Sequence, residues 1–165
     1  MKNKYKFYRK IFDIEWQNLY VYDDFVKNVS EKYNINFYIL KSIIVIEKIN
    51  RWNLYNRFVE ILLAYLIPKV IVVADFSIGL CQIKPSTAKK VYKTINNDNI
   101  IKLLINPYTN IHICAKIIHE MKAENLEEIV LLYLTGTKNK KYLDDISIKY
   151  YINLCKHGIT KQDCI

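Results

Sequence analysis

The chain has 165 residues, of which 52% are hydrophobic and 25% charged, a composition typical of one folded domain and too apolar for intrinsic disorder. It contains three glycines and three prolines, which argues against a fold of many short strands joined by tight turns and favours helices. The formal net charge of +9 predicts attraction to polyanions, whether nucleic acid, acidic lipid or cell wall, and does not choose among them.

Neither the beginning of the chain nor its most apolar stretch predicts a membrane segment. Five positive charges lie within the first ten residues, but Asp13 and Glu15 interrupt the apolar residues after them, so no signal peptide is predicted. Residues 58–74 are interrupted by Glu60, Pro68 and Lys69, and they fall short of the roughly 20 apolar residues of a spanning helix. We therefore expect no membrane span.

The four cysteines form no Cys-x-x-Cys pair, so no metal site is predicted. Cys81 and Cys114 lie among apolar residues, as core thiols do. Cys155 and Cys164 flank a short segment and could form a disulfide in an oxidising compartment.

The hydrophobic pattern predicts a succession of helices without internal repeats or linkers. Residues 71–73 are β-branched and are expected to form a short strand or extended piece, and residues 77–84 a loop or small β element. Pro85 opens a short helix, Asp98 is a candidate helix cap, and Gly136 ends a helix. The expected helices cover residues 18–32, 37–50, 54–66, 98–105, 107–122, 126–134 and 144–154.

Glu47 is the first candidate for chemistry. It comes after Leu40, Ile43 and Ile44 at helical spacing, so a carboxylate is predicted on the apolar face of its helix. Apolar surroundings disfavour the ionised form and raise the pKa of a carboxyl group, as a general acid near neutral pH requires. The alternative is that Glu47 ends the apolar stripe and reaches solvent, or pairs with Arg51.

Residues 77–88, Ser-Ile-Gly-Leu-Cys-Gln-Ile-Lys-Pro-Ser-Thr-Ala, form the most specific motif, which we call the signature segment. They resemble the Ser-x-Gly-Leu-Met-Gln-Ile-x-Pro-x-Thr-Ala pattern of the soluble lytic transglycosylase and goose-type lysozyme superfamily, with Cys81 in the place of Met. Gly79 would let the backbone approach a sugar, and Ser77 and Gln82 would hydrogen-bond its acetamido and hydroxyl groups. The alternative is a plain turn before a helix.

Two further matches come in the family's order. Residues 106–111 resemble the Asp-Pro-x-x-Asn-Ile start of a long helix, in which Asn110 has a structural or capping role. Residues 132–136 resemble the Ala-Tyr-Asn-x-Gly element, whose tyrosine points at the catalytic glutamate, and Tyr133 takes that place. Leu134 replaces the usual Asn.

The resemblance implies a mainly α, lysozyme-like fold, a helical bundle around a buried helix with a small β lobe beside a cleft. Residues 36–136 would form the catalytic core of a single compact domain, with a helical extension over residues 1–35 and a helix and tail over residues 137–165. The implied activity is lytic transglycosylation of peptidoglycan, with Glu47 as catalytic acid and base, no metal or organic cofactor, and 1,6-anhydro products. A monomer in the cell envelope or secreted is expected, retained in the cytoplasm before release if no export signal exists.

The chain departs from the family pattern most in its spacing. Residues 48–76 separate Glu47 from the signature segment, where the family has a dozen or so residues, so Glu60 remains a rival acid and Asp75 a supporting one. A second carboxylate at a suitable distance would make hydrolysis, as in lysozyme, the alternative reaction. A scaffold that binds wall polymer without cutting it, and a basic nucleic-acid-binding module, are further alternatives, although no nucleic-acid motif is present.

Overall fold

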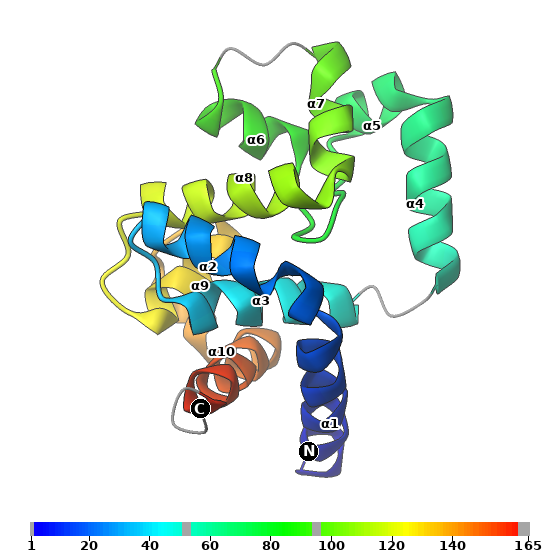
Figure 1. The fold of residues 1–165 in the computed structure, drawn as a ribbon. Helices are drawn as coiled ribbons and strands as arrows, with labels where there is room; N and C mark the ends of the chain where they lie inside the picture. The colour runs from blue at the N-terminus through cyan, green and yellow to red at the C-terminus, as the bar shows by residue number, and fades with distance from the viewer. Residues whose placement is uncertain (1, 51–53, 94–96, 162–165) are drawn as a thin grey trace.

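The computed structural model describes residues 2–50, 54–93 and 97–161. Within these ranges the chain forms ten α-helices and two short 3₁₀ helices (Figure 1). They are α1 (Lys2–Asn18), η1 (Tyr20–Tyr22), α2 (Asp23–Lys32), α3 (Phe37–Asn50), α4 (Leu54–Leu66), α5 (Pro68–Ala74), α6 (Pro85–Val91), α7 (Asn97–Ile105), α8 (Pro107–Glu120), α9 (Leu126–Thr135), η2 (Lys140–Asp144) and α10 (Ile146–Ile159). The predicted mainly α fold is confirmed.

Helix α3 is the buried helix at the centre of the bundle, packed by α1, α2 and α10 (Figure 1). Every residue from position 40 to 47 is buried, as expected for a helix that is apolar nearly all round. The polar exceptions have partners: Lys41 forms an ion pair with Asp23 at 2.5 Å, and the Ser42 hydroxyl donates to the carbonyl of Tyr38 at 2.6 Å. Glu47 therefore lies near the end of a helix that the rest of the fold surrounds.

Helix α8 organises the other half of the molecule, where α2, α6 and α7 pack against it. Asn106 caps its start by accepting from the amides of Tyr108 and Thr109, and Pro107 occupies the first turn, where a missing N–H costs nothing. Because α3 and α8 belong to different halves, the space between the halves is bounded by residues from distant parts of the sequence.

The expected β lobe is not confirmed. The described residues contain no strand, and the signature segment forms only an isolated antiparallel bridge between Ile78 and Ile83. Residues 78–83 turn back on themselves and are closed by this single bridge. A pair of strands needs several successive paired residues on each side, so the segment is too short to form a sheet.

The expectation of an extended piece at residues 71–73 is wrong. These residues belong to α5, in which Pro68 occupies the first turn and Asp75 ends the helix in the left-handed conformation. Ile71 is buried, and α5 packs on α7, so tertiary contacts outweigh the weak β preference of branched side chains.

The boundaries of most predicted helices are confirmed within a few residues, but the beginning of the chain differs. The helix expected at residues 18–32 is divided: α1 already ends at Asn18, and η1 separates it from α2. Helix α1 lies within the helical extension expected over residues 1–35, for which no helix before residue 18 is delimited from the sequence. The candidate cap Asp98 lies one residue inside α7.

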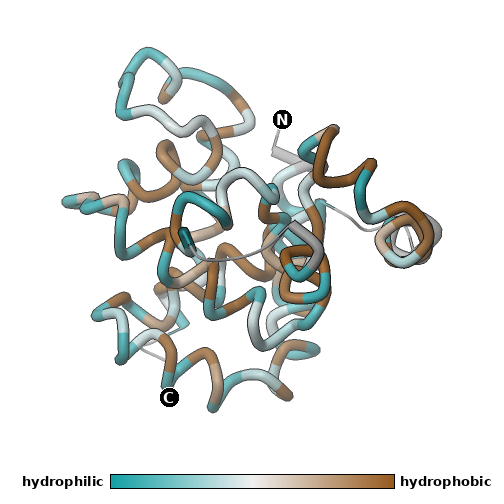
Figure 2. Tube along the Cα trace, turned by 90° about the horizontal axis from the view of Figure 1, so that it is seen from above, coloured by the Kyte–Doolittle hydropathy of each residue, from teal (hydrophilic) through white to brown (hydrophobic). Residues whose placement is uncertain are grey.

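Helices α4 and α5 form an arm with an exposed apolar face. Helix α4 packs mainly on α5 and α7, and Figure 2 shows it at the right margin of the molecule. The exposed large hydrophobic residues of this arm are Ile61, Leu62, Leu63, Tyr65, Leu66, Ile67, Val70 and Val73. The arm fills most of the interval between Glu47 and the signature segment.

Candidate active site

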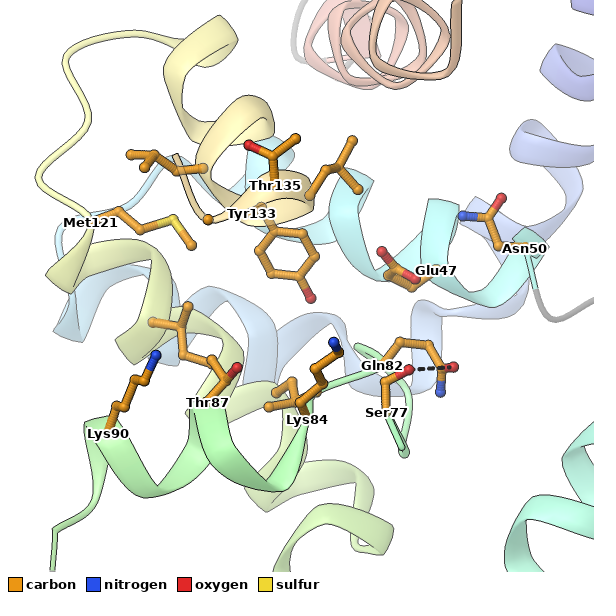
Figure 3. A pocket seen from close by; sticks show the side chains of 15 residues that line it. Glu47, Asn50, Ser77, Gln82, Lys84, Thr87, Lys90, Met121, Tyr133 and Thr135 are labelled. Carbon is orange, nitrogen blue, oxygen red and sulfur yellow. Dashed lines mark hydrogen bonds between the residues drawn. The ribbon is translucent and has the colours of Figure 1, made fainter. Parts of the chain in front are cut away.

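A cleft of about 630 Å³ lies between the two halves of the molecule (Figure 3). Its walls come from the end of α3, the signature segment with α6, the end of α8, and the end of α9. The described residues that line it are Glu47, Asn50, Ser77, Gln82, Ile83, Lys84, Thr87, Lys90, Ile117, Met121, Leu132, Tyr133, Leu134, Thr135 and Gly136.

Glu47 lies in the wall of this cleft with 8% of its surface exposed. Ile43, Ile44 and Ile46 on the same helix are buried around it, so the carboxyl group meets the core on one side and the cleft on the other. The structure thus brings Glu47 to the surface of a cavity rather than to open solvent. Arg51, the alternative ion-pair partner, lies outside the described residues.

Tyr151 on α10 holds the Glu47 carboxylate. Its hydroxyl donates to Oε1 of Glu47 at 3.4 Å, and Asn50 donates a hydrogen bond to the same hydroxyl. Burial, with the negative charge of Glu47, raises the pKa of Tyr151, so the hydroxyl stays protonated and available as a donor.

The sequence did not single out Tyr151. It shares a helix face with Ile148, Ile152 and Cys155, and a tyrosine in such a stripe is ordinarily part of the core. The feature that could have identified Tyr151 is its hydroxyl, because a buried tyrosine hydroxyl within an apolar stripe needs a hydrogen-bond partner.

Tyr133 on α9 also lines the cleft (Figure 3), but its hydroxyl is anchored to the signature segment. It donates to the backbone carbonyl of Cys81 at 2.5 Å, and the Cys114 thiol lies 3.7 Å away. Burial raises the pKa of Tyr133 well above its ordinary value, and Cys114, Cys81 and Glu47 raise it further. Tyr133 therefore joins α9 to the loop that faces Glu47.

Ser77 and Gln82 line the cleft together, with the Ser77 hydroxyl 3.5 Å from Oε1 of Gln82 (Figure 3). Gln82 has a left-handed backbone, with φ of 47°, which costs a non-glycine residue about 1 kcal/mol. Its own side chain offsets this by donating to the carbonyl of Gly79 at 3.1 Å. The turn thus fixes the amide of Gln82 at the cleft.

Gly79 does not line this cleft. It is buried, has φ of 82°, and borders a smaller cavity of about 170 Å³ together with Glu60 and Ile105. A Cβ atom at this position would come within 2.2 Å of the Asn110 side chain and of the Leu104 carbonyl. The structure gives the glycine a packing role behind the cleft wall, in place of the predicted contact with sugar.

Asn110 fixes the signature segment from behind, as its expected structural role requires. The side chain is fully buried on α8 and accepts from the backbone N–H of Cys81 at 2.7 Å. Its amide group donates to the carbonyls of Leu104 at 2.9 Å and Ile78 at 3.3 Å. The match at residues 106–111 therefore marks the residue that sets the shape of the loop.

The two candidate supporting acids do not line the cleft. Oε1 of Glu60 accepts from the backbone N–H of Gly79 at 2.8 Å, and Oε2 accepts from Gln82 at 3.4 Å. Asp75 accepts from the backbone N–H of Ser86 at 2.8 Å and from its hydroxyl at 2.6 Å. Glu60 holds the back of the signature segment, and Asp75 ties α5 to the first turn of α6.

The cysteines are free thiols where the structure describes them: Cys81, Cys114 and Cys155 are all buried. Burial raises the pKa of the Cys155 thiol to about 12, which makes it unreactive. The possible disulfide partner, Cys164, lies outside the described residues.

The mainly α fold, with a carboxylate between a central helix and a cleft, agrees with the lysozyme-like arrangement that the sequence resemblance implies. Comparison with known families matches residues 24–144 to the transglycosylase SLT domain. The chain belongs to this family, whose members are lytic transglycosylases that cleave peptidoglycan. The match begins within α2 and ends within η2, leaving α10 and its Tyr151 beyond it.

Searches of curated proteins and of solved structures returned no match. Family membership makes the chain an enzyme that acts on the cell wall. No helix within the described ranges has both the length and the apolarity needed to cross a membrane.

Proposed function

We propose that this enzyme cleaves the β-1,4 linkage between N-acetylmuramic acid and N-acetylglucosamine with Glu47 as its single catalytic acid and base. The observation that carries the proposal is that Glu47 is the one carboxylate among the described residues lining the cleft. Ser77, Gln82 and Tyr133 line the same cleft and are proposed to contact the sugars. Gly79 and Glu60 are proposed to keep Gln82 in position from behind.

In the first step Glu47 donates its proton to the oxygen that bridges the two sugars, and the bond from that oxygen to C1 of the muramic acid breaks. In the second step the C6 hydroxyl oxygen of the same sugar bonds to C1, and its proton returns to Glu47. A 1,6-anhydro ring forms without consuming water. The tethered hydroxyl is favoured because an intramolecular group reacts at an effective concentration far above that of an ordered water.

Tyr151 supports this cycle as a positioning residue. Its hydrogen bond stabilises the carboxylate form of Glu47, the form present between the two steps. Since Asn50 donates to the Tyr151 hydroxyl, the hydroxyl hydrogen is directed at the carboxylate.

Hydrolysis, as in the muramidases, is the alternative reaction. It would require a second carboxylate, about 5–9.5 Å from the first, to act as nucleophile or to activate water. Asp75 and Glu60 are the sequence candidates, and both accept backbone hydrogen bonds outside the cleft lining. This arrangement favours transglycosylation.

The test is to digest purified glycan strands and to weigh the soluble fragments. Fragments ending in 1,6-anhydro-N-acetylmuramic acid, about 18 mass units lighter than reducing ends, are expected because no water is added. Glu47→Gln keeps the shape but transfers no proton, so it should lower the rate by about 10²–10⁴-fold.

Glu60→Gln and Asp75→Asn are the controls, and each is expected to lose much less activity than Glu47→Gln. Reducing ends in the products would make the enzyme a hydrolase. If Glu47→Gln and one control lose activity equally, the carboxylate changed in that control takes part in the mechanism. If the unaltered chain releases no fragments at all, it is a scaffold that binds the wall polymer without cutting it.

A further inference from the structure

Helix α6 presents a row of three side chains to the cleft. Lys84, at its N-cap, Thr87 and Lys90 are spaced three residues apart and all line the cleft. At 1.5 Å per residue the two lysines are about 9 Å apart along the helix. Figure 3 shows both ammonium groups directed away from α6, toward the side on which Glu47 and Tyr133 lie.

These two lysines leave the cleft with an excess of positive charge. Among the described lining residues they face one carboxylate, that of Glu47. Within the described part of the chain, neither ammonium group forms an ion pair or a hydrogen bond. Other lysines do have such partners, as Lys138 has in Glu128, at 3.2 Å.

A glycan of N-acetyl sugars is neutral except for the lactyl group of the muramic acid. That group ends in a carboxylate, or in a peptide that itself carries carboxylates. Both lie beside the sugar ring rather than in the chain of linkages, so they project toward a wall of the cleft when the linkage is placed at Glu47.

We infer that Lys84 and Lys90 form a subsite for carboxylates carried on the lactyl group of the muramic acid. The inference rests on the proposed function, since it takes the glycan to lie in this cleft. An exposed ion pair contributes a few-fold to affinity, so the pair together selects strands that carry these acids over neutral ones. Thr87, between the two lysines, adds a hydroxyl that can hydrogen-bond the same groups.

The experiment compares three substrates freed of phosphate-bearing polymers: peptide-bearing strands, the same strands with their carboxylates converted to amides, and peptide-free strands with a free lactyl carboxylate. The double variant Lys84→Gln, Lys90→Gln is expected to raise KM about tenfold on the charged peptide-bearing strands, with kcat unchanged. On the amidated strands KM should change little.

Lys89→Gln is the matched control, because Lys89 is on the same helix and is not among the residues that line the cleft. It removes the same charge from α6 and should leave KM unchanged. If the double variant also raises KM on peptide-free strands, the subsite binds the lactyl carboxylate. If KM on these strands does not change, the subsite binds the carboxylates of the peptide.

Equal losses on charged and amidated strands, or the same loss in Lys89→Gln, would overturn the inference. Binding of the same three substrates to the Glu47→Gln chain, with and without the lysine changes, separates the two claims. If the chain cleaves the strands and the lysine changes leave KM unaltered, only the subsite is refuted. Absence of any cleavage refutes the proposed function, while the binding series still tests the subsite.

Discussion

At the scale of single residues, the hydrogen bond from Tyr151 to Glu47 gives the sharpest prediction. Tyr151→Phe removes the hydroxyl and keeps the ring, so it should lower kcat by about tenfold, which corresponds to about 1.4 kcal/mol, with little change in KM. A purely structural role would instead change the free energy of unfolding and leave kcat per folded molecule intact.

The neighbouring Tyr150 provides the control for this experiment. Its hydroxyl is buried with no hydrogen-bond partner within the described residues, so Tyr150→Phe should leave activity unchanged and stability equal or slightly higher. If both variants lose activity alike, the effect comes from the packing of α10 and not from the bond to Glu47.

Two glycines with left-handed backbones allow packing to be separated from backbone strain. Gly79→Ala should destabilise the fold by about 3 kcal/mol or more, because the added Cβ meets Asn110 and Leu104 in addition to the strain of a positive φ. Gly136→Ala has nothing within 4 Å of the added atom and should cost only about 1 kcal/mol. Urea unfolding of the two variants measures the difference. Comparable losses would mean that the loop at Gly79 moves aside.

At the scale of elements, His112 joins three parts of the fold. His112 lies on α8. Its Nδ1 is 2.7 Å from the hydroxyl of Tyr92, the residue directly after α6. Its Nε2 is 3.2 Å from the hydroxyl of Tyr33, the residue directly after α2. Burial lowers the pKa of His112, and the positive charges of Lys32 and Lys116 lower it further. The ring is therefore neutral in the folded chain at neutral pH.

This shift has a direction that can be measured. Below about pH 6.5 the unfolded chain takes up a proton at this histidine that the folded chain resists, so stability falls as the pH falls toward the folded pKa. His112→Gln should be less stable by about 1–2 kcal/mol near pH 7.5, since two hydrogen bonds are lost. Between about pH 7.5 and 5.5 its urea midpoint should drop less than that of the unaltered chain. Identical drops would assign the pH dependence to other groups.

At the scale of the whole molecule, the net charge of +9 favours long-range attraction to an anionic wall. Raising the salt concentration from about 0.1 M to about 1 M shortens the Debye length from about 10 Å to about 3 Å, so sedimentation with wall fragments should weaken at least tenfold. Binding of the enzyme to neutral N-acetylglucosamine oligomers should depend little on the salt concentration. Wall binding that ignores salt would mean that contacts with the sugars alone hold the enzyme, and a parallel titration with DNA tests the nucleic-acid alternative.

Much of the site can be predicted from the sequence because its parts are local. Glu47 sits on the apolar face of a helix, and helical periodicity makes that visible. The signature segment includes Gln82 and Pro85, so its turn and the start of α6 are encoded within a few residues. The mainly α fold is predicted in the same way from the apolar patterns of α3, α8 and α9.

The tertiary structure alone decided which side chains meet across the chain. Tyr151 contacts a residue 104 positions away, and periodicity cannot tell a tyrosine in a core stripe from one that holds a carboxylate. The sequence predicted Gly79 as a residue that approaches sugar and Glu60 as a rival or supporting acid. Their place behind the cleft depends on how α4 folds back onto the signature segment. Local patterns fix helices because backbone preferences act over a few residues, whereas the roles of these groups depend on packing between helices far apart in sequence.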